Sequence, residues 1–216
     1  GFDYASPQEA QESGSRWFPC VKGGPFRKWY GNIEYVIDWK NDGEAIRNLR
    51  DDSGQILSRV GNVQYFFREG LTWSGVGSSG FSVRHFDRGY VFNSVGRSLF
   101  PLQYRHFVLG YLNSAVCSAY LKVLAPTLHF SVGDVANLPV ASAEFSTMQE
   151  IEGVVSRLVE IARDDWNSNE FSWGFKRSSL TVEPTIEEAT VSWASLCHSR
   201  MSEMKRGEEK LNDLFV

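Results

Sequence analysis

Short apolar runs, interrupted by glycine and serine, dominate the first half of the chain. The runs cover residues 17–21, 33–39, 70–76, 81–86 and 90–100. They are rich in β-branched and aromatic side chains, which predicts strands. A turn at Gly23–Gly24–Pro25 separates the first two runs. With a short helix expected over 44–49 and a surface loop over 51–61, this half is predicted to be mainly a sheet.

The spacing of apolar residues changes after Pro101. Between residues 104 and 123 they recur three and four positions apart. This spacing predicts an amphipathic helix, which we expect to be broken near Asn113 and ended by Pro126.

Two further helices are marked by capping boxes, in which a serine or threonine precedes an acidic or amide residue by three positions. Ser146 with Gln149 begins a helix that should run to about Asp165, and a box at Thr185 begins one that should reach Leu214. The two helices could pair antiparallel or pack on a missing part of the protein. A helical pair after a β-rich part could form a spacer arm, or the helices could simply cover the sheet. The pattern leaves these arrangements open.

These elements predict an α+β fold in three parts. Residues 1–15 lack any periodicity and are expected to form a flexible N-terminal segment. Residues 16–142 should form a β-rich α+β domain, and residues 143–216 a helical pair that acts as a spacer or tail.

Composition is that of a soluble globular protein, with 42% hydrophobic and 22% charged residues. No apolar run is long enough to span a membrane, and no secretory signal is evident. The chain begins at Gly1 without a methionine, so we expect it to be a piece of a longer protein. Three widely spaced cysteines fit a reducing cytoplasm rather than a disulfide framework or a zinc site.

Charge is distributed unevenly. Residues 1–142 hold 14 basic and 12 acidic side chains, whereas residues 143–216 hold 8 basic and 14 acidic ones. Two basic stretches lie in the first part: Ser13 to Ile33 contains no acid, and Arg84 to Arg105 contains only Asp87. A local basic stripe is what a nucleic-acid phosphate responds to, so the net charge of -4 does not exclude DNA binding.

No set of residues in the chain predicts catalysis. The run Gly75–Gly80 matches the G-x-G-x-x-G pattern, but a strand-like segment follows it, so we interpret it as a hairpin loop rather than a dinucleotide site. The four histidines have no partner at metal-ligand spacing, and no nucleophile elbow is present. We therefore expect no enzyme complete within this chain.

The segment Lys22–Asn32 is the most distinctive stretch of the sequence. Its glycines would let the backbone approach a ligand closely, and Arg27 and Lys28 could contact phosphates. Trp29 or Tyr30 could stack on a base, and Asn32 could read an adenine edge. The alternative is a loop whose aromatic residues fill the core and whose cations are solvated.

Several motifs resemble one protein family along nearly the whole chain from Trp17 onward. They are Trp17–Pro19, Lys22–Gly24, Phe26–Asn32, Glu34–Val36, Trp39–Gly43, Gly70–Ser74, Phe81–Arg84, Leu109–Ser114, Pro126–Leu128, Val132–Asp134, Asp165–Trp166, Ser172–Arg177 and Glu209–Phe215. Their order and number resemble the C-terminal part of the PglX family, the adenine-specific DNA methyltransferases of BREX phage-defence systems.

The resemblance implies a defined role. Such enzymes join an S-adenosylmethionine-dependent methyltransferase domain to a target-recognition domain, which is similar to the specificity domains of restriction-modification systems. The methyltransferase signature is absent here, so the chain resembles the recognition domain alone, with no cofactor of its own. It would bind double-stranded DNA and position the target adenine for the missing methyltransferase domain of the same protein, which must flip that base out of the duplex.

The alternative function is a protein-interaction module. In that case the acidic C-terminal helices would dock other BREX components. For DNA recognition, base choice is expected in the less family-like stretches 51–64 and 75–80. The candidate DNA-contacting residues are Lys22, Arg27, Lys28, Trp29, Tyr30, Asn32, Trp73, Ser74, Arg84, Arg88 and Arg97. We predict no catalytic, cofactor-binding or metal-ligating residue and no membrane partner.

Overall fold

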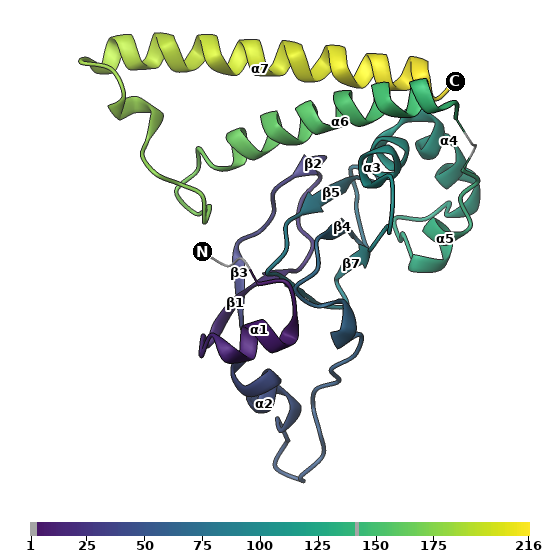
Figure 1. The fold of residues 1–216 in the computed structure, drawn as a ribbon, viewed down its shortest axis with the longest axis vertical. Helices are drawn as coiled ribbons and strands as arrows, with labels where there is room; N and C mark the ends of the chain where they lie inside the picture. Colours follow the sequence, from purple (N-terminus) through teal and green to yellow (C-terminus); the bar gives the residue numbers. More distant parts are fainter. Residues whose placement is uncertain (1–3, 141–142) are drawn as a thin grey trace.

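The computed structural model describes residues 4–140 and 143–216 and has the predicted α+β architecture (Figure 1). The helices are α1 (Pro7–Glu12), α2 (Lys40–Arg47), α3 (Arg105–Asn113), α4 (Ala115–Leu124), α5 (Val132–Ala136), α6 (Phe145–Trp166) and α7 (Ile186–Leu214), with short 3-10 turns η1 (Val63–Tyr65) and η2 (Ser179–Thr181). The strands are β1 (Trp17–Val21), β2 (Trp29–Tyr30), β3 (Tyr35–Asp38), β4 (Gly70–Ser74), β5 (Val83–Phe86), β6 (Val91–Phe92) and β7 (Gly96–Leu99).

The strands form two small mixed sheets. One has the order β3-β1-β6, with β1 antiparallel to β3 and parallel to β6. The other has the order β2-β5-β4-β7, in which β4 pairs antiparallel with both β5 and β7, and β2 lies parallel to β5. The strands lie within the predicted apolar runs except for β2, which falls between the first two runs and forms by pairing with Arg84 and His85 of β5. The expected surface loop after α2 forms the lower end of the molecule in Figure 1.

One predicted run, 90–100, divides into two strands in different sheets. The division lies at Asn93, whose side-chain oxygen accepts hydrogen bonds from the backbone N–H groups of Val95 and Gly96, both at 3.0 Å. This local turn competes with continued strand pairing, as asparagine side chains commonly do. The chain therefore leaves β6 and enters the second sheet as β7.

The N-terminal segment differs from its prediction. We expected residues 1–15 to lack regular structure, but α1 forms within the described part of this segment. Ser6 caps the helix by accepting from the N–H of Glu9 at 3.2 Å, and Pro7 occupies the first helical position. Ala10 is buried against a second, smaller core that includes Phe18. The Ser-Pro-x-Glu pattern was a capping signal that the search for periodicity missed.

The predicted break near Asn113 is confirmed. Helices α3 and α4 meet there at 66°. The Asn113 amide turns to the backbone of Val83, accepting from its N–H and donating to its carbonyl, each at 2.9 Å. Ser114 then caps α4 by accepting from the N–H of Cys117. Among the described residues no single helix is long and apolar enough to cross a membrane, although this bent pair passes the test of length and composition.

Helices α6 and α7 pair antiparallel, which is one of the arrangements that the sequence left open. Arg157 on α6 contacts Glu203 on α7 at 2.7 Å, and Gly207 brings α7 close enough that a Cβ there would lie 2.8 Å from Leu158. The predicted cap of α7 is confirmed, with Thr185 accepting from the N–H of Glu188. The predicted cap of α6 at Ser146 is wrong, because the N-cap residue is Glu144, two positions earlier, and no side chain caps this helix.

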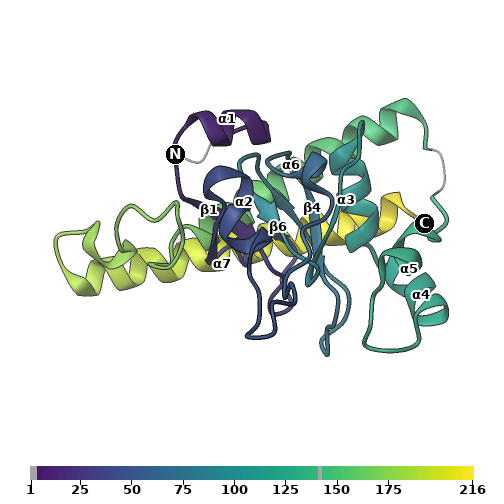
Figure 2. The same ribbon diagram turned by 90° about the horizontal axis from the view of Figure 1, so that it is seen from below.

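The main core extends across the boundary placed at residue 142. Buried Leu71 on β4, Leu109 on α3 and Leu158 on α6 belong to one cluster, to which α7 adds Leu211. Seen from below in Figure 2, the β-rich part lies in front of the two long helices. Helix α6 thus covers the sheet, while the N-terminal half of α7 leaves residues such as Val191 exposed.

Candidate nucleic-acid interface

The backbone of the Lys22–Asn32 segment is fixed by polar contacts. Gly24 exchanges two hydrogen bonds with the Ser74 hydroxyl, at 3.0 and 2.8 Å, and the Asn32 amide donates to the Pro25 carbonyl at 2.8 Å. Gly24 has φ +145°, and a Cβ there would lie 2.7 Å from the Asn32 amide nitrogen. Glycine is therefore required to close the loop on itself, a structural reason separate from any ligand.

The aromatic residues of this segment point into the protein. Trp29 is 1% exposed and Tyr30 is 6% exposed, and Asn32 is also buried. The Trp29 indole donates to Glu208 at 2.8 Å, and the Tyr30 hydroxyl donates to Asp87 at 3.1 Å. Burial, together with the nearby Tyr90 and the Asp87 carboxylate, raises the pKa of Tyr30 well above its ordinary value. Stacking of a base on either ring would require these side chains to become exposed.

The cations of the same segment contact acids of the helical pair. The Arg27 guanidinium pairs with Asp165 at the end of α6 and lies 5.2 Å over the ring of Trp166. The Lys28 ammonium pairs with Glu208 of α7 at 2.8 Å. By contrast Lys22 is exposed, with its ammonium 4.4 Å from the centre of the Tyr35 ring. Of these three candidate DNA-contacting cations, Lys22 is the one that is exposed.

The remaining candidates lie on different strands of the larger sheet, except for Arg88, which lies in the turn after β5. The buried Trp73 indole donates to the Phe130 carbonyl at 3.0 Å, and the Arg97 guanidinium donates to the same oxygen. Arg84 is fully buried, whereas Arg88 is exposed. The structure therefore does not gather the predicted residues on one surface, and the exposed ones among them are the better candidates for DNA contact.

A cleft of about 490 Å³ brings together two stretches that the sequence singled out. Its walls are the tip of the Lys22–Asn32 segment, the Gly75–Gly80 loop and the end of α4. Phe26, which is 49% exposed, and the exposed Lys122 of α4 both line the cleft. The buried Phe81 and Phe130 line it as well. An aromatic ring can stack on a base and a lysine can bind a phosphate, and here both lie beside a loop of small residues.

The Gly75–Gly80 run is a hairpin loop, as predicted. It joins β4 to β5, which pair antiparallel, so no helix begins after its last glycine. Backbone bonds from Gly77 to the Leu128 carbonyl and from Phe130 to the Gly75 carbonyl hold the loop beside the 128–130 segment. This geometry does not fit the strand-to-helix turn that binds a nucleotide-type cofactor.

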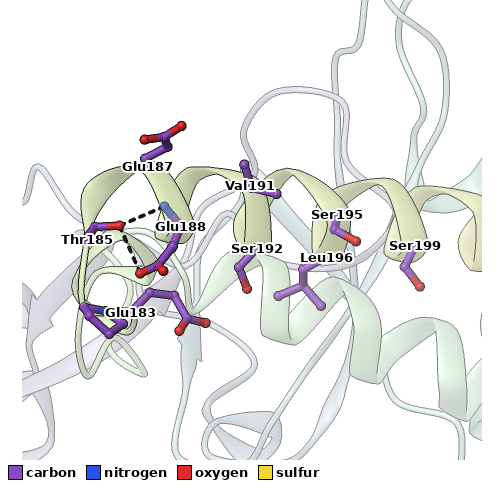
Figure 3. A pocket seen from close by; sticks show the side chains of 10 residues that line it. Glu183, Thr185, Glu187, Glu188, Val191, Ser192, Ser195, Leu196 and Ser199 are labelled. Carbon is purple, nitrogen blue, oxygen red and sulfur yellow. Dashed lines mark hydrogen bonds between the residues drawn. The ribbon is translucent and has the colours of Figure 1, made fainter.

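A second, more open groove of about 1300 Å³ runs along the N-terminal half of α7 (Figure 3). Glu183, Glu187 and Glu188 are at its outer end, where the Thr185 hydroxyl bonds to Glu188. Val191 and Leu196 line the groove farther along the helix. The carboxylates would repel phosphate, so this groove is suited to a protein surface rather than to DNA.

Sequence reasoning missed a cluster of ionisable residues around His85. Its Nε2 atom lies 3.4 Å from Glu69 and 3.3 Å from Asp87, and Arg163 of α6 contacts Asp87 at 2.7 Å. Burial raises the pKa of Asp87, but the hydrogen bonds and charges of His85 and Arg163 outweigh burial and lower the pKa to about 2. The signal was strand pairing: Gly70 opposes Phe86, which puts the acids that flank them at one edge.

This cluster ties β5 to α6 through Asp87 and Arg163. No group of three His, Cys, Asp or Glu side chains suited to a metal ion occurs in residues 4–140 and 143–216. We assign the cluster to the packing of the helix on the sheet.

No family model matches the chain, but two curated relatives do. The adenine-specific methyltransferase PglX of Lacticaseibacillus casei (strain Zhang) is 40% identical over 215 residues, which cover 95% of this chain and 18% of the relative. The adenine-specific methyltransferase BrxX of Escherichia coli O9:H4 (strain HS) is 32% identical over 188 residues, which cover 85% of this chain and 14% of the relative. The resemblance inferred from the motifs is confirmed, and it concerns less than a fifth of either relative.

Proposed function

We propose, from the similarity to segments of two adenine-specific methyltransferases, that this chain is the DNA target-recognition domain of such an enzyme. The observation that carries the proposal is the 40% identity to PglX along 95% of the chain. We further propose that the chain acts in the cytoplasm and binds duplex DNA. Methyl transfer from S-adenosylmethionine would then occur in another part of the parent protein. The chain would position the target adenine in front of that part.

The cleft beneath Phe26 supports this role. It offers an exposed ring, the ammonium of Lys122 and the loop 75–80, which the sequence marks as a region of base choice. Lys22 is exposed at the start of the segment that contains Phe26. Lysines that grip the DNA backbone fix the orientation of a domain, while a nearby loop can read base edges.

The test is DNA binding by the chain and by the parent enzyme, measured by fluorescence anisotropy at several salt concentrations. Binding through phosphates should weaken steeply as salt rises. Lys122→Ala should lower the slope of log K against log salt by about 1, because one phosphate contact is lost. Lys176→Ala, at an exposed position after α6, is the matched control and should leave the slope unchanged. A flat salt response in both proteins would refute the proposal.

A second candidate function is supported by the groove along α7. Its glutamates and exposed Val191 suit a basic, partly apolar protein partner, which we propose is another component of the same defence system. Val191→Glu in the parent enzyme should abolish co-purification of that component and leave DNA affinity unchanged. Unaltered co-purification would eliminate this groove as the docking site.

A further inference from the structure

Arg84 is a buried cation whose hydrogen-bonding capacity is largely unused. It is 1% exposed on β5, where its backbone pairs with Trp29 on one side and Thr72 on the other. Its Nη1 atom donates to the backbone carbonyl of Arg27 at a long 3.4 Å. Its Nε and Nη2 atoms find no partner among the described residues. A guanidinium has five N–H donors, so most of this group's donors are available.

The surroundings of Arg84 are electropositive. No carboxylate of residues 4–140 or 143–216 forms an ion pair with it, and Arg27 is the neighbouring charge. Burial, and then the Arg27 cation, lower the pKa of Arg84 to about 10, so the group stays charged at neutral pH. Asp165 compensates Arg27 alone. Buried charges in proteins are normally paired, and this one lacks an anion.

A small polar cavity is lined by residues that share the backbone contact of Arg84. It has a volume of about 180 Å³ and is lined by Ser74 and Ser82, by residues 24–26 and by residues 76–80. Ser82 lies immediately before β5 and two positions before Arg84. Both side chains contact the backbone of Arg27, because the Ser82 hydroxyl accepts from its N–H and Arg84 donates to its carbonyl. At roughly 30 Å³ per water, the cavity can hold a phosphate group with some of its hydration.

The backbone of residues 24–27 contacts both the cavity and Arg84. Gly24 lines the cavity, and the Arg27 carbonyl is the atom that Arg84 contacts. The hydroxyls of Ser74 and Ser82 hold this backbone in place, through the bonds to Gly24 and one from the Arg27 N–H at 3.3 Å. For this backbone to move these bonds must break, and Gly23 and Gly24, which have φ +94° and +145° and no side chain, are the positions where it can change direction at the smallest steric cost. Once it moves, both hydroxyls and the guanidinium are available to one ligand.

We propose that Arg84, with the hydroxyls of Ser74 and Ser82, forms a binding site for a phosphate group, which enters when the backbone of residues 24–27 is displaced. A guanidinium and hydroxyls are suited to phosphate oxygens, and Arg84 binds two of them in its forked geometry. The identity of the ligand rests on the proposed function: within a DNA complex the phosphate belongs to the DNA backbone.

The first test uses inorganic phosphate as the probe, with the 216-residue chain. Thermal unfolding is followed while phosphate replaces chloride at constant ionic strength. The wild-type midpoint should rise with phosphate concentration, because a ligand that binds only the folded state stabilises it. Arg84→Met should unfold at a higher temperature in chloride, since a buried unpaired charge is removed, and should show no response to phosphate.

Two further variants keep this test decisive. Arg105→Met removes a guanidinium that already pairs with Glu69 at 2.7 Å, so it should keep the full phosphate response. Ser82→Ala retains Arg84 and should reduce the phosphate-dependent rise in the unfolding midpoint to half or less. This variant tests the site even if Arg84→Met does not fold. An equal response of wild type, Arg84→Met and Ser82→Ala, or no wild-type response, would overturn the site.

The second test separates this site from the proposed function. If DNA fills the site, Arg84→Met should weaken duplex binding about tenfold and lower the salt slope by about 1. If Arg84→Met loses the phosphate response but wild type does not bind DNA, the anion site stands and the DNA proposal is refuted. DNA binding with an unchanged slope in Arg84→Met would keep the proposed function and refute the site.

Discussion

The β-rich part of the chain and its helical pair differ in charge, and in the structure opposite charges of the two parts form ion pairs with each other. The β-rich part is slightly basic, and the helices are strongly acidic. Arg27 and Lys28, the two central cations of the basic segment, pair with Asp165 and Glu208 on the helices. Charge asymmetry along a sequence can therefore indicate two surfaces that meet, as well as two parts with separate tasks.

The two parts also differ in how they use their apolar residues. Strands and α6 bury theirs in one continuous core, whereas the N-terminal half of α7 presents Val191 and its neighbours to solvent. The helical pair is thus integral to the domain at one end and free at the other. The predictions below test this division and the charge contacts, beginning with the largest effect.

The largest effect is expected from the shared core. Leu158 on α6 is 1% exposed, and Leu158→Ala should destabilise the chain by about 2–5 kcal/mol through lost burial and a cavity. Urea unfolding followed by tryptophan fluorescence and by circular dichroism should show one transition, shifted equally for both probes. The control Val191→Ala, at a 67% exposed site, should change stability by less than about 0.5 kcal/mol. Two separate transitions would mean that the helices fold independently.

The pH dependence of stability should reveal the contact between β5 and α6. The folded pKa of Asp87, about 2, lies below the ordinary 3.8, so its contribution is present above about pH 4 and is lost as pH falls toward 2. With its side chain about one-third exposed, that contribution is about 1–2 kcal/mol. Asp87→Asn should be less stable than wild type at pH 6, and the difference should shrink by pH 2. A stability difference between wild type and Asp87→Asn that does not depend on pH would contradict the lowered pKa of Asp87.

Glu208→Gln is expected to lower stability by a smaller amount and to strengthen DNA binding. The change removes the ion pair to Lys28 and weakens the bond from the Trp29 indole, which should cost about 1 kcal/mol. It also frees Lys28 for phosphate, so duplex DNA should bind severalfold more tightly at low salt. Isothermal denaturation and fluorescence anisotropy measure the two effects. Glu209→Gln, on the same helix, is the control and should change neither.

The smallest effect is expected at the free end of α7. Thr185→Ala removes the cap of this helix, at a local cost of about 1 kcal/mol. Because the adjoining turns are exposed, hydrogen exchange should speed up there while the global unfolding free energy stays the same. Slower exchange, or a loss of global stability, would show that this end belongs to the core.

Much of the fold could be predicted from the sequence, because strand runs, the break at Asn113 and the cap at Thr185 depend on neighbouring residues. Misses arose where a signal was local but weak, as at Ser6, or where a helix began before its capping signal, as at Ser146.

The candidate site was harder to predict, since burial is decided by distant partners. Trp29 and Lys28 bond to Glu208, about 180 positions away, and no local pattern announces that contact. Glu69 lies beside His85 only because β4 pairs with β5, whereas Asp87 is two positions away in the sequence.

The central claim, that this chain recognises a DNA target, is tested most directly by methylome sequencing of cells that express the parent enzyme. Replacing Ser78 and Ser79 in the 75–80 loop with asparagine and arginine should change the sequence context of methylated adenines. The same double change at the exposed Ser192 and Ser195 of α7 is the control and should leave that context unaltered. Unchanged sequence context in the loop variant, with only the amount of methylation reduced, would contradict the assignment of base choice to this cleft.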